Sequence, residues 1–211
     1  MEYNSGTGGG HAVSFPSPSL DMPPSKSITR TPTELVTYSS TVPFAEARAR
    51  LEEYIKRNAS IEQGVLAKIG GAESAEELTK AVGDVTQGGD FLFFQDYTFN
   101  GFLSLLEGRT VPPTKGYIFG NPLIARFILE RDLIGGTFIP PRILLREHGY
   151  QGHSSGRPLT TLQYHKPSTL LPKAHLDRDK ELKKQLEGLD AKIEEMVLEV
   201  LDENGPVKGK L

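Results

Sequence analysis

The sequence of 211 residues contains no cysteine. Disulfide bonds, thiolate nucleophiles, zinc ribbons and iron–sulfur clusters are therefore excluded. Long apolar runs are also missing: none approaches the roughly 18 residues that a membrane-spanning helix needs, so we expect no membrane partner. The start of the chain lacks the charged segment followed by an apolar one that marks a secretion signal. These absences predict a soluble, cytoplasmic protein.

The sequence carries no excess of positive charge. Its 24 Lys and Arg residues are outnumbered by 27 Asp and Glu residues, which gives a net charge of −3. No basic stripe with interleaved aromatic residues is present, so nucleic acid is not an expected partner. The length predicts one domain with tails.

The composition divides the chain into three parts. Residues 1–32 are rich in Gly, Ser and Pro and have no apolar period, so they predict a disordered N-terminal arm. Residues 33–172 carry strand and helix patterns and predict one α+β domain. Residues 173–211 contain a single predicted helix, from 177 to about 203, and a tail.

The predicted C-terminal helix carries an apolar seam with alternating spacings of four and three residues. The seam consists of Leu182, Leu186, Leu189, Ile193, Met196 and Val200. Such a seam fits two arrangements, and the sequence leaves both open. Either the helix packs on the sheet of its own chain, or it pairs with a second chain and makes the protein a homo-oligomer, most simply a homodimer.

Alternating and β-branched or aromatic patterns predict five strands, at residues 35–40, 91–99, 116–119, 137–147 and 159–165. Helical spacing predicts helices at residues 43–58, 74–85 and 123–129. Pro140 and Pro141 fall inside the fourth strand and predict a bulge or an edge position there, because proline cannot pair in a central strand. The order of elements favours an α+β fold with an antiparallel sheet of about four to five strands backed by helices.

The most informative segment runs from Lys115 to Pro122. A short apolar strand leads into Gly120-Asn121-Pro122, and a helical run begins at once. Gly and Asn tolerate positive φ, and proline suits the first position of a helix. A strand, a tight corner and a helix make a rigid junction of the kind that borders pockets.

Three motifs follow one another in an order that suggests a family. They are Tyr-Ile-Phe-Gly-Asn-Pro at 117–122, Phe-Ile-Pro-Pro-Arg-Ile-Leu-Leu at 138–145 followed by Glu147, and Gln-Tyr-His-Lys-Pro at 163–167. This order resembles the domain of unknown function 302 family over about residues 33–171. The resemblance implies a small α+β sandwich with an antiparallel sheet backed by helices. That family has no agreed reaction, so the resemblance implies a fold more than a function.

Four polar residues are candidates for chemistry. Asp96 lies in an aromatic strand and would act as a general acid or base if buried, and His165 is a second acid–base candidate. Arg126 and Arg142 would bind a carboxylate or phosphate. The alternative for Asp96 is a carboxylate that is exposed at the strand end or bonded to the backbone. The alternative for Arg126 is a solvated helix face, and for Arg142 an edge-strand charge that discourages aggregation.

Histidines at 148, 153 and 165 lie at predicted strand ends and in the loop between them. Three imidazoles would suit a metal, but their spacing matches no ligand motif, and surface histidines explain the same residues. We therefore predict no metal site and no cofactor.

Three functions remain open, and the sequence does not decide whether the protein is an enzyme. The first is a module that binds a small, largely apolar metabolite near the 120–122 corner, through Tyr117, Phe119, Asn121, Arg126 and Arg142. Phe94, Phe127 and Phe138 would complete its apolar wall. The second is a cofactor-independent lyase, isomerase or cyclase that uses Asp96 or His165 as acid–base. The third is a non-catalytic interaction protein that oligomerises through its C-terminal helix.

Overall fold

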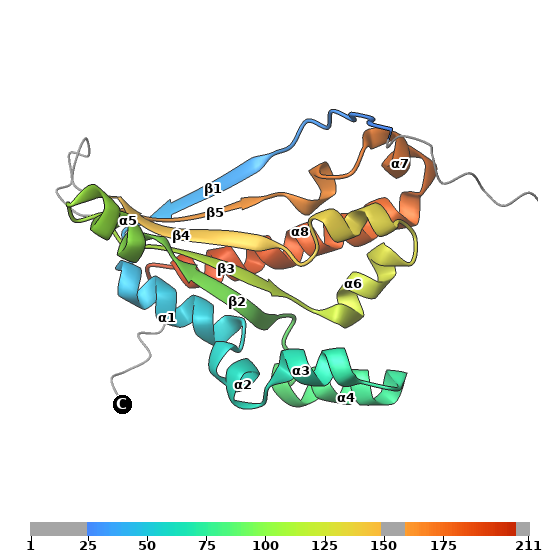
Figure 1. The fold of residues 1–211 in the computed structure, drawn as a ribbon, viewed down its shortest axis with the longest axis horizontal. Coiled ribbons are helices and arrows are strands. Elements are labelled where there is room, and N and C mark those ends of the chain that lie inside the picture. The colour runs from blue at the N-terminus through green and yellow to red at the C-terminus, as the bar shows by residue number, and fades with distance from the viewer. Residues whose placement is uncertain (1–24, 149–158, 206–211) are drawn as a thin grey trace, which may run out of the picture.

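The computed structural model describes residues 25–148 and 159–205. Its centre is a five-stranded antiparallel sheet in the order β1-β5-β4-β3-β2 (Figure 1). The strands are β1 (Leu35–Ser40), β2 (Leu92–Thr98), β3 (Thr114–Gly120), β4 (Arg142–His148) and β5 (Leu159–His165). The predicted α+β class is confirmed, and β1 and β5 have the predicted bounds. Most of the predicted N-terminal arm lies outside the described residues.

Helices connect β1 to β2, β2 to β3 and β3 to β4, and two further α-helices follow β5 (Figure 1). They are α1 (Phe44–Tyr54), α2 (Arg57–Glu62), α3 (Val65–Gly71), α4 (Ala75–Thr86), α5 (Phe99–Glu107), α6 (Pro122–Leu129), α7 (Lys173–Arg178) and α8 (Lys180–Leu201), with the short 3₁₀ helices η1 (Leu133–Thr137) and η2 (Pro167–Thr169). None of the helices in the described ranges is long and apolar enough to cross a membrane.

The two sides of the sheet differ in what covers them. Tyr117 of β3, Ile143 of β4 and Leu162 of β5 point to one side, where they share a hydrophobic core with α1 and α8. Because side chains alternate along a strand, their neighbours Gly116 and Leu144 face the other side. We call the first side the helix face and the second the open face. Helix α5 lies at one end of the sheet (Figure 1), where its Phe99 reaches the open face at Gly116.

The apolar seam of the C-terminal helix packs on its own chain. All six seam residues are buried in the core that α8 shares with α1 and the sheet. The structure therefore shows the first of the two arrangements that the sequence left open. The predicted helix from 177 is interrupted, because α7 ends at Arg178 and Asp179 starts α8 as its N-cap, accepting a hydrogen bond of 2.9 Å from the Leu182 amide.

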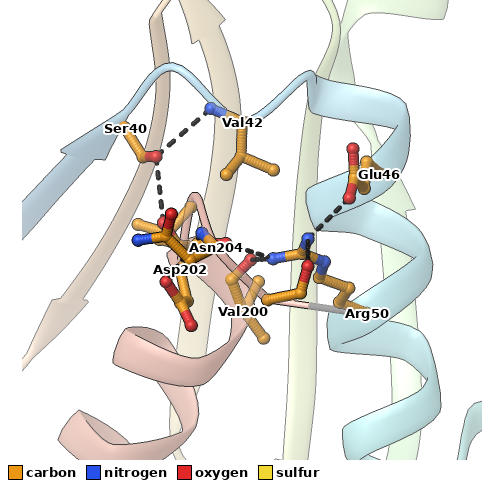
Figure 2. A network of polar contacts seen from close by, with 9 residues as sticks. Ser40, Val42, Glu46, Arg50, Val200, Asp202 and Asn204 are labelled. Atoms are coloured by element: carbon orange, nitrogen blue, oxygen red, sulfur yellow. Dashed lines mark hydrogen bonds and ion pairs between the residues drawn. The ribbon is translucent and has the colours of Figure 1, made fainter. Parts of the chain in front are cut away.

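The carboxyl end of α8 is held by side chains from α1 and β1 (Figure 2). The Arg50 guanidinium donates hydrogen bonds to the carbonyl oxygens of Asp202, at 2.6 Å, and Val200, at 3.3 Å. The Ser40 hydroxyl donates to the Leu201 carbonyl oxygen at 3.0 Å. These donors satisfy carbonyls that a helix end leaves without partners, so they fix α8 against the sheet.

The expectation for Pro140 and Pro141 was wrong. We expected them inside a strand, at a bulge or a sheet edge, but β4 begins only at Arg142 and pairs with β3 and β5 on its two sides. The prolines precede the strand, where their missing amide hydrogens cost no pairing. The Pro141 carbonyl still accepts a hydrogen bond of 3.3 Å from the Phe119 amide, so this segment ends beside the 120–122 corner.

Candidate functional site

The corner at 120–122 is built as a helix cap. The Asn121 side-chain carbonyl accepts a hydrogen bond of 2.9 Å from the Leu123 amide and starts α6, with Pro122 at its first position. The Asn121 amide group donates a 3.0 Å bond to the Asp90 carbonyl oxygen, just before β2. Asn121 thereby fixes α6 and the entry to β2 with one side chain.

Gly120 is needed at this corner because other groups pack closely against it, and not because the backbone has a positive φ. The corner does not use the left-handed region: Asn121 is extended, with φ −146 and ψ 117. A Cβ added at Gly120 would lie 3.2 Å from the Pro140 Cβ and 3.3 Å from a ring carbon of Phe94. A side chain at this position would therefore push the proline segment away from the end of β3.

A cavity of about 280 Å³ lies beside this corner, where the sequence predicted a hollow. Its wall is mostly apolar and includes Phe94, Ile124, Ala125, Leu129, Ile139 and Leu189. Asn121 and Arg126 add the polar groups. Arg126 is largely exposed and pairs with Glu130 along α6, so it lies at the rim. We call this space the corner cavity.

The other aromatic residues expected around the corner occupy different places. Phe119 is fully buried in the core and Tyr117 almost so, and both face α1 and α8. Phe138 packs on the same core from its edge, whereas Phe127 is half exposed on α6. Of the expected aromatic wall, Phe94 alone is among the residues that line the corner cavity.

Asp96 lies in an ion-pair cluster on the helix face, which consists of Glu52, Arg57, Asp96 and Lys115. The Asp96 carboxylate forms ion pairs with Arg57, at 2.8 Å, and with Lys115, at 3.0 Å. Lys115 also contacts Glu52 at 3.1 Å. Lys56 places Arg57 there: its backbone is left-handed, with φ 54, which ends the helical path of α1 and starts α2.

The cluster shifts the pKa values of the groups around it. Burial disfavours the ionised form of Asp96, but the contacts with Lys115 and Arg57 outweigh burial and hold the pKa of this carboxyl below its usual value. Burial, helped by a hydrogen bond to Glu52, raises the pKa of the Tyr117 hydroxyl well above its usual range. At neutral pH Asp96 is therefore an ionised, paired carboxylate, and Tyr117 is a neutral hydrogen-bond donor.

Arg142 and His165 lie on the open face, away from the corner. They line a second cavity of about 500 Å³ together with side chains of β1, β2, β3 and α5. We call this the sheet-face cavity. Asp96 and His165, the two acid–base candidates, therefore lie on opposite faces of the sheet.

The histidine group is only partly within the described residues. His153 lies outside them, together with the loop that carries it. The His148 ring contacts Arg146 and Thr161, each at 3.1 Å. Within residues 25–148 and 159–205, no group of three or more His, Asp or Glu side chains could hold a metal ion.

Two features of these sites were not predicted. The first is the ion-pair cluster around Asp96, whose other members come from positions 52, 57 and 115 and have no common sequence pattern. The second is α5, whose first residue, Phe99, was assigned to the preceding strand and whose other apolar residues were assigned to no element. A helical spacing of Phe99, Phe102 and Leu106 was the available signal, but the preceding strand was extended over its start.

Comparison with known proteins adds one finding. No family model and no curated protein matches the sequence. Among solved structures, the chain is similar to a crystal structure of an uncharacterized conserved protein DUF302 from Bacillus stearothermophilus, with 16% sequence identity and a TM-score of 0.51. The match covers 80% of this chain and 98% of that one. The chain therefore has a DUF302-like fold, as its motifs had indicated.

Proposed function

We propose that this protein is a binding module for a small, largely apolar metabolite, which it holds in the corner cavity. The observation that carries the proposal is the cavity itself: about 280 Å³ of mostly apolar space beside a capped, rigid corner. Its volume lies near the lower end of small-molecule sites, so the ligand is compact.

The polar groups at the corner set limits on the ligand. Both functional groups of the Asn121 side chain are already used, by Leu123 and Asp90. Arg126 is the charged group at the rim, and Glu130 partly neutralises it. A ligand in this cavity would therefore gain most from burial of apolar surface, with at most one polar contact at the entrance.

Filling the cavity tests the proposal. Ala125 lines it from α6, so Ala125→Phe would occupy the space with a ring, and Ala67→Phe on the exposed face of α3 is the matched control. Native mass spectrometry of protein purified from its own source should detect a bound small molecule in the wild type and the control, and none in Ala125→Phe. Wild-type protein without any bound molecule, or one retained in Ala125→Phe, would refute the proposal.

The ligand, once identified, gives a second measurement. At a concentration 100 times its dissociation constant it should stabilise the wild type by about 2.7 kcal/mol. Asp96→Asn should keep this gain, because Asp96 is absent from the wall of the corner cavity. Loss of turnover with retained binding in Asp96→Asn or His165→Ala would instead support the lyase, isomerase or cyclase hypothesis.

The oligomerisation hypothesis no longer has its expected surface. The seam of α8 is buried within the chain, so an oligomer would have to form elsewhere. Of the three functions, the binding module is the one that the corner cavity supports directly.

A further inference from the structure

The sheet-face cavity is a second hollow, separate from the corner cavity. Its floor consists of two rows of residues that cross the open face. In one row Leu35 pairs with His165, and Arg142 pairs with Ile118. In the next row Leu144 lies between Gln163 and Gly116, and Gly116 pairs with Tyr97. No residue lines both cavities, so they can be tested apart.

One wall of this cavity depends on a glycine. A Cβ at Gly116 would lie 2.9 Å from a ring carbon of Phe99, so the ring lies directly on the backbone of β3. Phe99 also stacks with Tyr97, with ring centroids 6.3 Å apart and an interplanar angle of 28°. The two rings form an apolar platform at the start of α5, and Tyr97 is 45% exposed. Such a platform suits a flat or branched apolar group.

The opposite part of the cavity is basic. Arg142 precedes Ile143 and His165 follows Tyr164, and because these two residues pair, Arg142 and His165 emerge side by side from β4 and β5. The Arg142 side chain makes no ion pair or hydrogen bond with any described residue. Arg146, on the same strand and face, instead contacts the His148 ring. The described residues that line the cavity include no Asp or Glu.

We propose that the sheet-face cavity binds an organic carboxylate with an aromatic or branched apolar body. The carboxylate contacts the Arg142 guanidinium, whose planar donors match its two oxygens. The apolar body lies against Tyr97, Phe99, Ile118 and Leu144. A volume of about 500 Å³ is within the range of small-molecule sites. A cation that has no partner among the described residues and lies in the same cavity as the Tyr97 and Phe99 rings complements this ligand class. This site does not depend on the proposal for the corner cavity.

The probe is 2-naphthoate, with 2-naphthalenemethanol as its uncharged counterpart, and binding is measured by isothermal titration calorimetry. We expect wild-type protein to bind naphthoate with a millimolar or tighter dissociation constant. Arg142→Gln should weaken that binding about tenfold or more, since it removes a hydrogen bond to a charged group. It should leave the weaker binding of the alcohol unchanged. Arg142 is exposed, so the variant should fold, which circular dichroism checks.

Two control variants decide what a loss of binding means. Arg146→Gln removes the same charge from the same strand and face outside the cavity, and it should bind naphthoate like the wild type. Ala125→Phe blocks the corner cavity and should also leave naphthoate binding unchanged. Equal losses in Arg142→Gln and Arg146→Gln, or loss in Ala125→Phe, would overturn the proposal, and so would wild-type protein that does not bind naphthoate at millimolar concentration.

Discussion

The Tyr117 hydroxyl donates a hydrogen bond of 2.8 Å to the carboxylate of Glu52, which lies 65 positions earlier in the chain. The bond joins β3 to α1 on the helix face, and the same Glu52 oxygen also receives Lys115. Tyr117 was expected to bind ligand, but this contact gives its hydroxyl a role within the fold.

Tyr117→Phe tests that role. The substitution keeps the ring in the core and removes the donor, so we expect the free energy of unfolding to fall by about 1 kcal/mol. Urea denaturation measures the loss. Binding of a corner-cavity ligand should not change, because the Tyr117 hydroxyl faces the helices. If Tyr117→Phe bound the ligand more weakly but unfolded with the same free energy as the wild type, this assignment would be contradicted.

Asp96→Asn should destabilise the protein at neutral pH by about 2 kcal/mol, because it removes one of the two carboxylates that pair with Arg57 and Lys115. Glu76→Gln, an exposed carboxylate on α4, is the control and should change little.

The difference in stability between the wild type and Asp96→Asn should depend on pH, because the pKa of Asp96 is lowered in the folded state. A carboxyl with a depressed folded-state pKa stabilises the fold above its ordinary pKa of 3.8 and loses this contribution as the pH falls through the lower, folded value. The difference in the free energy of unfolding between the wild type and Asp96→Asn should therefore have its full size at pH 6 and shrink below about pH 4. Denaturation curves at both pH values check it, and a gap that widens in acid would exclude the ion-pair explanation.

Two substitutions separate the two bonds of Asn121. Asn121→Asp keeps the oxygen that caps α6 and loses the donor to Asp90, whereas Asn121→Ala loses both. We expect Asn121→Ala to cost about 1 kcal/mol for the cap, with a further loss for the second bond. Asn121→Asp should fall between it and the wild type in thermal denaturation. If Asn121→Asp were as unstable as Asn121→Ala, the cap would have little weight at this corner.

The predictions from sequence succeeded where a local pattern was enough. Strand β5 was bounded correctly because alternation and flanking prolines mark a strand without reference to the rest of the fold. The corner was found because Asn121 and Pro122 suit the first positions of a helix. In contrast, the face of the sheet to which the Asp96 and Arg142 side chains point depends on strand register. The ion pair of Asp96 with Arg57 also depends on the left-handed residue Lys56 between α1 and α2. These are tertiary features, so one group of expected site residues was divided between two faces of the sheet.

The same limit applies to α5 and to the prolines before β4. Helix α5 was missed because its helical spacing begins at Phe99, which the sequence analysis assigned to the preceding strand. None of its residues is buried in the described structure. Pro140 and Pro141 were placed in a strand because apolar residues continue on both sides of them. Only the pairing of β4 with β3 shows that the strand begins after the second proline.

Asp190 gives a prediction of opposite sign, because its carboxylate is buried on α8 and one of its oxygens has no hydrogen-bond partner among the described residues. Its other oxygen accepts a hydrogen bond of 3.0 Å from the Ser168 amide, and burial raises the pKa of the carboxyl above its ordinary value of 3.8. The folded state then binds a proton more readily than the unfolded state, so stability declines as the pH rises from the ordinary pKa to the raised, folded-state pKa.

Asp190→Asn should remove this cost and stabilise the protein at pH 7 by about 1 kcal/mol, while the advantage disappears near pH 3. Thermal denaturation at both pH values measures it, with Glu195→Gln as the exposed control on the same helix. Destabilisation of Asp190→Asn at pH 7 would show instead that the ionised carboxylate has a partner, such as a bound cation or water.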